Sequence, residues 1–460
     1  MNNSKTKRRQ RAIAIGGSFT GLLAARVLSD HFEQVTLIER DKINDRPEAR
    51  KGQPQSHHAH SLLANGLDVL TRYFPDLPDG LRAGGATVTD IGTGFRWYAS
   101  GGYRLQFESG LASALMSRPF LEWQIRRRVL ALSNVTVLDQ STVTALLTTA
   151  DGGRVTGVRT LHQVEKSREA ALTADLVIDA TGRGSAGLKW LEALGYTGPK
   201  EETVKVGVAY TSRIYRRRPG DLVGAELVLI APEPPHNKRF GVMLPMEDDR
   251  WIVSLAGWAG NHAPANEAGF LEFARSLAAP DIYNMIPRLE PLTDFITHKF
   301  PSNLRHHYEN LTRFPGGFLV MGDAIASFNP VYAQGMSSAA MQAAALDELL
   351  AGRGSLDGLW EAFFKRAAKV VDLPWQLAAG QDFRFPETRG NKTPGTDLMN
   401  AYFAKVARAT HRDPVVYGAF LRVTNLMARR TSLFKLHILW RVLRGGIERR
   451  PVPVQKAHSP

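Results

Sequence analysis

The residues best suited to chemistry lie in the stretch Phe318–Ser337, which reads FLVMGDAIASFNPVYAQGMS. The apolar run Phe318–Met321 follows the turn-forming residues Pro315-Gly316-Gly317, so we predict a buried strand here. Asp323 comes just after this strand, and ligands bind at the carboxyl ends of the strands in open α/β sheets. Its carboxylate can therefore accept hydrogen bonds from the hydroxyl groups of a ligand.

The residues that follow Asp323 suit contact with a flat ring. Gly335 allows the backbone to approach such a ring closely, because glycine has no side chain. A helix expected to begin near Ser337 would direct the positive end of its dipole at the ring. This end would stabilise the negative charge of a reduced isoalloxazine, and the carboxylate of Asp323 would bind the ribityl hydroxyls attached to it.

The start of the chain predicts the second half of a dinucleotide site. We expect a strand at Arg11–Ile15, a tight turn at Gly16–Gly21, a helix at Leu22–Leu28 and a strand at Val35–Ile38 that ends in Glu39. In such a βαβ unit the pyrophosphate rests on the helix N-terminus, and the acidic residue holds a ribose hydroxyl. Gly16, Ser18 and Gly21 fill the three glycine positions of the fingerprint, with serine in the middle one.

A third segment, Ala174–Ser185, reads ADLVIDATGRGS and predicts another apolar strand that ends near Gly182. Together the three segments resemble the FAD-dependent monooxygenase superfamily related to the aromatic hydroxylases, over residues 11 to about 350. The residues that carry this resemblance are Gly16–Gly21, Glu39, Arg50-Lys51-Gly52, Asp175–Ser185 and Gly322–Met336. It implies FAD as the cofactor, bound non-covalently, and the chain has no cysteine to form a thioether link.

Four segments are also similar to the bacterial flavin epoxidases of polyether biosynthesis, which are themselves like squalene epoxidase. These segments are Lys51–His60, Ser117–Glu122, Pro245–Trp251 and Asn329–Tyr332. Many other bacterial hydroxylases carry similar segments, so this resemblance indicates a subfamily and not a substrate.

The resemblance implies roles for individual residues. Asp323 would contact the ribityl chain, and Arg50 and Arg118 would contact the FAD phosphates or the ribityl region. Pro330, Gly335 and Met336 would lie beside the flavin ring. The expected cofactor-binding residues are, in full, Gly16, Ser18, Gly21, Glu39, Arg40, Arg50, Arg118, Gly182, Gly322, Asp323, Gly335 and Met336.

We commit to no catalytic acid or base, and we expect no metal site. His57, His58 and His60 have a spacing that a metal could use, yet no acidic or cysteine partner lies nearby in the sequence. A structural or flavin-proximal role is therefore favoured for these histidines.

One departure from the resemblance concerns the electron donor. Aromatic hydroxylases usually carry Asp-Gly where this chain has Thr181-Gly182, and in them this region serves both FAD and NADPH. NAD(P)H is expected to supply electrons either directly or through a separate flavin reductase, and the missing aspartate favours the reductase.

The order of the segments, with the fold of the family, implies an α/β protein. A Rossmann-like FAD-binding domain would comprise residues 1–84, 116–195 and 301–352, interleaved with an antiparallel β-sheet substrate domain at 85–115 and 196–300. A C-terminal helical region would cover 353–460. The strands expected in the substrate domain are Val204–Tyr215, Ala225–Ile230, Arg239–Leu244 and Trp251–Trp258, with both tryptophans in the core.

The net charge of +14 is concentrated at the two ends of the chain. Residues 405–450 contain eleven basic side chains and two acidic ones. Nucleic acid is not an expected partner, because no recognition motif occurs. Leu433–Arg444 has an apolar side and a basic side, so it either lies on an anionic membrane or docks on the body of the protein. Without cysteine or a run of 18 apolar residues, we expect a cytoplasmic protein, with or without membrane association.

The expected chemistry is that of a flavin monooxygenase. Reduced FAD and dioxygen give a C4a-hydroperoxyflavin, whose distal oxygen an electron-rich alkene can attack without a protein base. The leading hypothesis is epoxidation or hydroxylation of a lipophilic polyene, terpenoid or polyketide. The alternatives are a prenyl-chain reductase, a flavin halogenase and a flavin-holding peripheral membrane protein without turnover. The halogenase is disfavoured because no Trp-x-Trp-x-Ile-Pro motif occurs.

Overall fold

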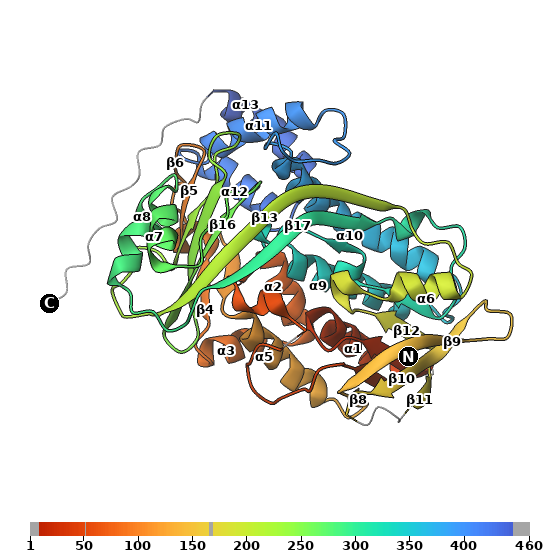
Figure 1. Ribbon diagram of the computed structural model, residues 1–460. Helices are drawn as coiled ribbons and strands as arrows, with labels where there is room; N and C mark the ends of the chain where they lie inside the picture. The colour runs from red at the N-terminus through yellow and green to blue at the C-terminus, as the bar shows by residue number, and fades with distance from the viewer. Residues whose placement is uncertain (1–8, 51, 165–168, 445–460) are drawn as a thin grey trace, which may run out of the picture.

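The computed structural model describes residues 9–50, 52–164 and 169–444 (Figure 1). Lys51 and several charged residues at the two ends of the chain lie outside the described residues: Lys5, Lys7, Arg8 and residues 448–450.

One half of the molecule is built on a five-stranded sheet with the strand order β18-β12-β1-β2-β8, in which all neighbouring strands run parallel. The strands are β1 Arg9–Ile15, β2 Phe32–Ile38, β8 Val135–Leu138, β12 Leu176–Asp179 and β18 Phe318–Val320. All residues of β12 and β18 are buried, as expected for a parallel sheet covered on both faces. The strands predicted near Arg11, Val35 and Phe318 are confirmed.

Helices and a small sheet pack around these parallel strands. The helix α1, Phe19–His31, packs against β1, β2 and the helix α9, Gly335–Ala351. The helices α2, Ala64–Tyr73, and α5, Arg118–Leu130, contact α9 and α1 respectively. A three-stranded antiparallel sheet contacts β12 through β10; its strands are β9 Ser141–Thr148, β10 Val155–His162 and β11 Glu169–Thr173.

The other half is built on an eight-stranded, mostly antiparallel sheet with the order β19-β17-β13-β16-β15-β14-β5-β6. Its strands are β5 Phe95–Ala99, β6 Gly102–Tyr103, β13 Glu201–Arg216, β14 Leu227–Ile230, β15 Arg239–Met246, β16 Arg250–Gly257, β17 Ile296–His306 and β19 Ala326–Ser327. Figure 1 shows the long strands β13 and β17 crossing from this sheet towards α6, Gly187–Ala193. Trp251 and Trp258 are each 1% exposed, so the prediction that they belong to the core is confirmed.

Shorter elements complete this half. The helices α7, Glu267–Arg275, and α8, Asp281–Met285, pack against the sheet through a core that includes Phe270 and Ile282. A third sheet has the order β3-β7-β4. Its strands and the adjacent short helices are β3 Ser61–Leu62, β4 Thr87–Asp90, β7 Ala112–Leu115, α3 Leu77–Ala83 and α4 Ile91–Gly94.

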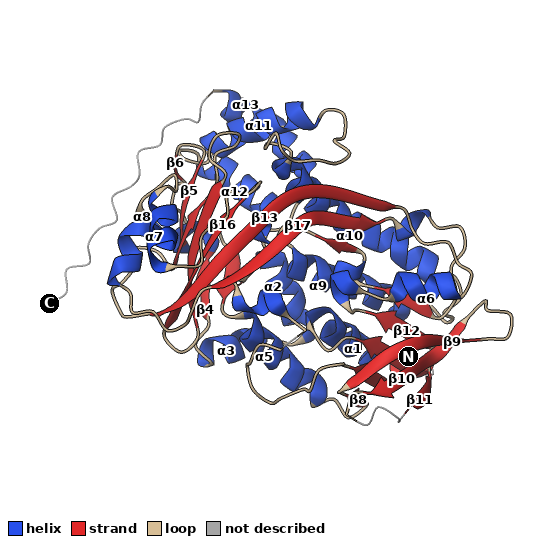
Figure 2. Cartoon of the chain, in the orientation of Figure 1, coloured by secondary structure: helices blue, strands red, loops and turns tan. Residues whose placement is uncertain are grey.

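From Leu359 to Leu443 the chain is mainly helical, as predicted, and the last three of these helices contact one another towards the top of the molecule in Figure 2. They are α10 Leu359–Asp382, α11 Thr396–Ala409, α12 Pro414–Thr424 and α13 Leu436–Leu443. Val406, Val416, Leu433 and Ile438 contribute to a core shared by the last three helices. Within the described residues, no helix is both long enough and apolar enough to cross a membrane. The parallel sheet, the larger antiparallel sheet and the helices around them confirm the α/β fold class expected from the sequence.

Candidate functional site

The turn between β1 and α1 is closed by two glycines that tolerate no side chain. Gly16 has a φ of +104°, and a Cβ atom there would lie 2.8 Å from the carbonyl oxygen of Ala180, just after β12. A Cβ atom on Gly21 would lie 1.6 Å from the carbonyl oxygen of Gly16. The turn therefore holds β1, α1 and β12 close together, and the N-terminus of α1 begins directly behind it. This is the arrangement in which backbone N–H groups can bind a phosphate.

Glu39 follows β2 and is buried beside the same turn. Its carboxylate accepts hydrogen bonds from the backbone N–H groups of Gly17, at 2.6 Å, and Asp41, at 2.9 Å. The guanidinium of Arg50 lies 3.0 Å from Glu39 and donates to the carbonyl oxygen of Gly17 at 2.9 Å. A carboxylate has about four acceptor sites, so Glu39 retains the capacity to accept from a hydroxyl group. Arg40 is exposed and lies beside Gly52, away from these contacts.

Glu122 on α5 is a partner of this turn to which the sequence interpretation assigned no role. It is 1% exposed, and its Oε1 accepts from the hydroxyl of Ser18 at 2.8 Å and from Nε of Arg118 at 2.6 Å. Burial alone would raise the pKa of Glu122, but Arg118, Arg50 and two hydrogen bonds outweigh burial and lower it. The carboxylate is therefore ionised. It holds Arg118, the first residue of α5, beside Phe19 at the start of α1.

Asp323 follows β18, which is separated from β1 by the single strand β12. Gly322 before it has a φ of +69°, and a Cβ atom there would lie 2.5 Å from the hydroxyl oxygen of Thr20 on α1. This close approach links the two predicted cofactor segments. Asp323 is exposed and makes no hydrogen bond to another described residue, although protein atoms crowd it enough to raise the pKa of its carboxyl by desolvation. Arg118 and Arg183 oppose that shift with their positive charges.

The start of α9 is open in front of Asp323. A Cβ atom on Gly335 would meet only Oδ1 of Asp323, at 3.8 Å, so the backbone is accessible here. Met336 is buried, and Pro330 is exposed in the short 3-10 turn Pro330–Tyr332. The helix predicted near Ser337 thus begins two residues earlier, at Gly335.

Gly182 follows β12, the strand that lies between β18 and β1 in the parallel sheet. It has a φ of +81°, and a Cβ atom on either Gly182 or Gly184 would meet no atom within 4 Å. The adjacent Arg183 donates to the carbonyl oxygen of Ser302 at 2.5 Å and to the hydroxyl of Ser327 at 2.7 Å. Arg183 therefore connects the parallel sheet with strands β17 and β19 of the larger sheet.

Asp382 at the end of α10 fixes the turn that contains Pro330. It is fully buried, and its carboxylate accepts hydrogen bonds from four side chains: Asn329 at 3.0 Å, Tyr332 at 3.0 Å, Trp258 at 3.0 Å and Asn303 at 2.8 Å. Burial raises the pKa of Asp382 to about 6, and the four donors act against this shift. The sequence interpretation did not identify this residue.

The histidines near position 58 join the site to the larger sheet. His58 is 4% exposed, and its Nδ1 lies 2.8 Å from the hydroxyl of Ser212 on β13. Its ring packs edge-on against Tyr210, with the centroids 4.5 Å apart, and lies 5.8 Å from the ring of His298. Burial lowers the pKa of His58 to about 3 and that of His60 to about 4, the latter with a contribution from Arg118. Both imidazoles are therefore neutral at pH 7. No cluster of metal-ligating side chains occurs in the described part of the chain.

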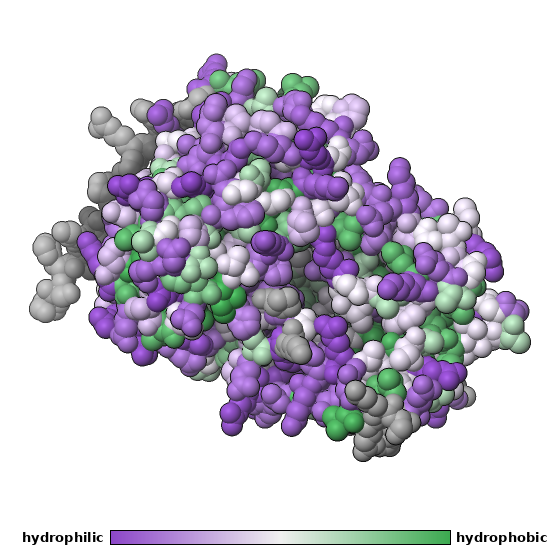
Figure 3. Space-filling model, viewed as in Figure 1, coloured by the Kyte–Doolittle hydropathy of each residue, from purple (hydrophilic) through white to green (hydrophobic). Residues whose placement is uncertain are grey.

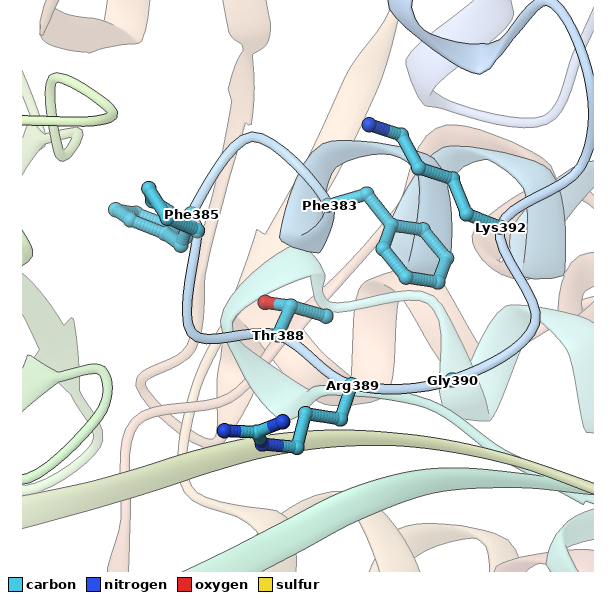
Figure 4. Close-up of a pocket in the computed structure, with 7 residues that line it drawn as sticks. Phe383, Phe385, Thr388, Arg389, Gly390 and Lys392 are labelled. Carbon is cyan, nitrogen blue, oxygen red and sulfur yellow. The ribbon is translucent and has the colours of Figure 1, made fainter.

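A separate cavity of about 440 Å³ lies in the loop that follows Asp382 (Figure 4). Figure 4 shows the ring of Phe383 turned into this loop and Arg389 extended towards a strand of the larger sheet. The lining residues are Phe383, Phe385, Pro386, Thr388, Arg389, Gly390 and Lys392. None of the predicted cofactor-binding residues lines this cavity, so we treat it as distinct from the candidate site.

The residues at the candidate site fit FAD. The glycine turn before α1, the open backbone at Gly182 and at Gly335, and the exposed carboxylate of Asp323 lie along the carboxyl ends of neighbouring strands. Such ends are where open α/β sheets bind dinucleotides. The predicted residues lie in segments that the structure brings to this edge, while their individual contacts with FAD stay predictions.

Solved structures with the same overall fold include flavin enzymes. Over 83% of this chain, PqsL of Pseudomonas aeruginosa, a probable FAD-dependent monooxygenase, matches with a TM-score of 0.59 and 16% identity, covering 99% of PqsL. The p-nitrophenol 4-monooxygenase PnpA of Pseudomonas putida matches with a TM-score of 0.62 and 17% identity, over 92% of this chain and 99% of PnpA. The flavin-dependent halogenase CmlS matches with a TM-score of 0.62 and 19% identity, over 91% of this chain and 77% of CmlS. The chain thus has the fold of the FAD-dependent monooxygenase superfamily, as its sequence resemblance implied.

The chain is more similar in sequence to a mycobacterial protein than to these three solved structures. Protein Rv3254 of Mycobacterium tuberculosis is 33% identical over 436 residues, which cover 90% of this chain and 89% of Rv3254. The chain therefore belongs to the same family as Protein Rv3254. A scan against protein-family models found no match.

Proposed function

We propose that this protein is an FAD-dependent monooxygenase that epoxidises or hydroxylates a lipophilic, alkene-containing substrate. The observation that carries the proposal is the meeting of the Gly16–Gly21 turn with the Gly322–Gly335 segment, in which Gly322 packs directly against Thr20. A dinucleotide bound by the first segment would extend its ring system to the second. The fold shared with flavin monooxygenases supports the same assignment.

In this proposal the chain's own residues bind and orient FAD. The N-terminus of α1 would hold the pyrophosphate, Glu39 a ribose hydroxyl and Asp323 the ribityl chain. Glu122 would keep Arg118 in place beside them through the 2.6 Å hydrogen bond. Bound FAD would supply dioxygen activation, which protein side chains cannot provide.

The positive end of the α9 dipole would stabilise negative charge on the ring, with Gly335 allowing the ring to approach the helix. Asp382 would hold the Asn329–Tyr332 turn rigid through its hydrogen bonds to Asn329 and Tyr332. A rigid turn orients the ring with respect to the substrate, and orientation is a large part of enzymatic rate enhancement.

The charge state of the groups next to this region supports an uncharged substrate. His58 is neutral at pH 7, and burial raises the pKa of the Tyr210 phenol and lowers that of His298, so these groups are neutral too. A neutral lining would favour a lipophilic alkene over a carboxylate or a phosphate, because burying a charge without a partner is costly.

The proposal is tested by reconstitution and product analysis. Purified protein should bind FAD and show a flavin visible spectrum, and an alkene substrate should gain one oxygen atom derived from ¹⁸O₂. A product that gains two hydrogens without dioxygen would identify a reductase, and a halide-dependent product would identify a halogenase. Failure to bind FAD under any condition would overturn the proposal as a whole.

We also propose that the electrons come from NAD(P)H through a separate flavin reductase. The support is Thr181, which replaces the usual aspartate and whose hydroxyl is hydrogen-bonded to Asp179 at 2.6 Å. The hydroxyl is thus already engaged within the protein.

A further inference from the structure

The C-terminal helix α13 is attached to the body of the protein along one side only. Ile438 and Val442 are buried in the core shared with α11 and α12. Arg441 donates a 2.8 Å hydrogen bond to Asp413, whose side chain is fully buried at the start of α12. These contacts fix the orientation of the helix, so its opposite side has a defined position on the surface.

The outward side of α13 is apolar. Leu436 is 85% exposed, Leu443 69% and Trp440 43%. Docking of the helix on the body through these three residues would have buried them, but it uses Ile438 and Val442 instead. Figure 3 shows apolar residues at the top of the molecule, over the region where Figure 1 places α11 and α13. Leu398 on α11, which contacts α13, is 78% exposed.

Basic side chains lie at both ends of this apolar side. Residues 429–444 contain Arg429, Arg430, Lys435, Arg441 and Arg444 and no acidic residue. Lys435 and Arg444 are exposed next to the apolar residues, and the guanidinium of Arg444 lies 4.3 Å from the centre of the Trp440 ring. Of the basic residues in this segment, Arg441 is ion-paired with a described acidic residue.

We propose that residues 429–444 form a docking surface for an anionic lipid bilayer. Leu436, Trp440 and Leu443 would enter the boundary between headgroups and acyl chains, as the apolar face of an interfacial helix does. Trp440 would lie at the depth that tryptophan favours in membranes. The basic residues would attract the negatively charged headgroups, so that binding depends on the charge of the lipid.

A second copy of this chain fits the surface less well. A symmetric dimer would place the same patch on both partners, which would bring the basic residues of one copy against those of the other. A helix as short as α13 also offers little area compared with a stable interface, which buries about 800 Å² per partner. Charge complementarity therefore favours an anionic bilayer.

The test is flotation of the full-length protein with liposomes of neutral phosphatidylcholine or of phosphatidylcholine with phosphatidylglycerol. We expect recovery with the anionic vesicles to exceed recovery with the neutral ones at least tenfold, and to fall when the salt concentration rises. The triple variant Leu436→Ser, Trp440→Ser, Leu443→Ser and the double variant Lys435→Glu, Arg444→Glu should each lose most of this binding.

Two control variants change comparable exposed residues elsewhere. Val223→Ser removes an apolar side chain that is 74% exposed, and Lys365→Glu with Lys369→Glu reverses two exposed charges on α10. Both controls should float like the unchanged protein, and circular dichroism should show that all variants are folded. Equal recovery with neutral and anionic vesicles, no recovery with either, or undiminished binding by the triple variant would overturn the proposal. Light scattering that shows a dimer dissociated by the triple variant would instead identify a second copy as the occupant.

The bilayer proposal is independent of the flavin chemistry. Flotation of protein that binds no FAD would support the docking surface and leave the proposed function unsupported. Protein that binds FAD normally but does not float with anionic vesicles would overturn the docking surface and leave the proposed function supported.

Discussion

The phenol of Tyr332 donates a hydrogen bond to Oδ1 of Asp382 at 3.0 Å, although the two residues are 50 positions apart in the sequence. Asn329 donates to the same oxygen, so the turn that carries Pro330 is tied at two points to the end of α10. Trp258 and Asn303 bind the same carboxylate from the larger sheet. Asp382 therefore joins the candidate ring site, the larger sheet and the C-terminal helices.

This relationship predicts an unusual pH dependence of stability. Burial raises the pKa of Asp382 to about 6, above its ordinary value of 3.8, so the folded protein binds this proton more tightly than the unfolded chain. The stabilisation that tighter binding of this proton gives the folded protein is complete below pH 3.8 and is lost as the pH rises through 6. The shift corresponds to about 3 kcal/mol at neutral pH.

Asp382→Asn removes this titration. The free energy of unfolding of the variant, relative to the unchanged protein, should increase by about 2 kcal/mol between pH 4 and pH 7. Urea denaturation at several pH values measures the difference. The control is Asp79→Asn, whose side chain is 88% exposed. If the free energy of unfolding of Asp382→Asn differed from that of the unchanged protein by the same amount at every pH, Asp382 would not titrate in this range.

The second prediction concerns Asp323. Replacing it by alanine should weaken FAD binding by roughly 10-fold to 100-fold, the usual contribution of a hydrogen bond to a charged group. The thermal stability of the protein without FAD should change little, because Asp323 makes no hydrogen bond to a described residue. Fluorescence titration with FAD measures the affinity. Asp79→Ala is the matched control, and an equal affinity for all three proteins would remove Asp323 from the site.

The third prediction concerns Glu122, whose carboxylate binds Arg118 and lies 3.6 Å from Arg50. Glu122→Gln should reduce the free energy of unfolding at pH 7 by about 3 kcal/mol, because it leaves the guanidinium of Arg118, which is largely removed from water, without its carboxylate partner, while Arg50 keeps Glu39. The pKa of Glu122 is lowered in the folded state, so its contribution is present above the ordinary value of 4.5 and is lost as the pH falls. The deficit of the variant should therefore shrink below pH 4.5. Glu361→Gln, at an exposed position on α10, should cause no measurable deficit at either pH.

The parts of the fold that the sequence could predict are those with local signals. The β1-α1-β2 unit has apolar strands, a glycine turn and an acidic residue within about 30 positions, so its pattern is complete in one short segment. Gly16, Gly182 and Gly322 all have positive φ values, which is a local requirement that glycine satisfies. The antiparallel strands β15 and β16 are likewise joined by a short turn that the sequence shows directly.

The missed residues act through distant partners. The hydrogen bond from Trp258 to Asp382 spans 124 positions, and that from Ser18 to Glu122 spans 104. A single acidic residue in an amphipathic helix gives no local sign that four donors will converge on it. The orientation of α13 was missed for a related reason, because the helix has apolar residues on both sides and tertiary contacts decide which side is buried.

The fourth prediction concerns the source of electrons and rests on the proposed function. NADPH alone should reduce the bound FAD more slowly than the enzyme turns over, and an added flavin reductase with NADPH should raise turnover. The physical reason is that Thr181 supplies no carboxylate at the position where the aromatic hydroxylases use one for both FAD and NADPH, and its hydroxyl is engaged by Asp179. Stopped-flow absorbance measures the bleaching of FAD by NADPH under anaerobic conditions, and oxygen consumption measures turnover with the reductase. Bleaching at a rate that matches turnover would show that the protein accepts electrons directly, and the reductase would then be unnecessary.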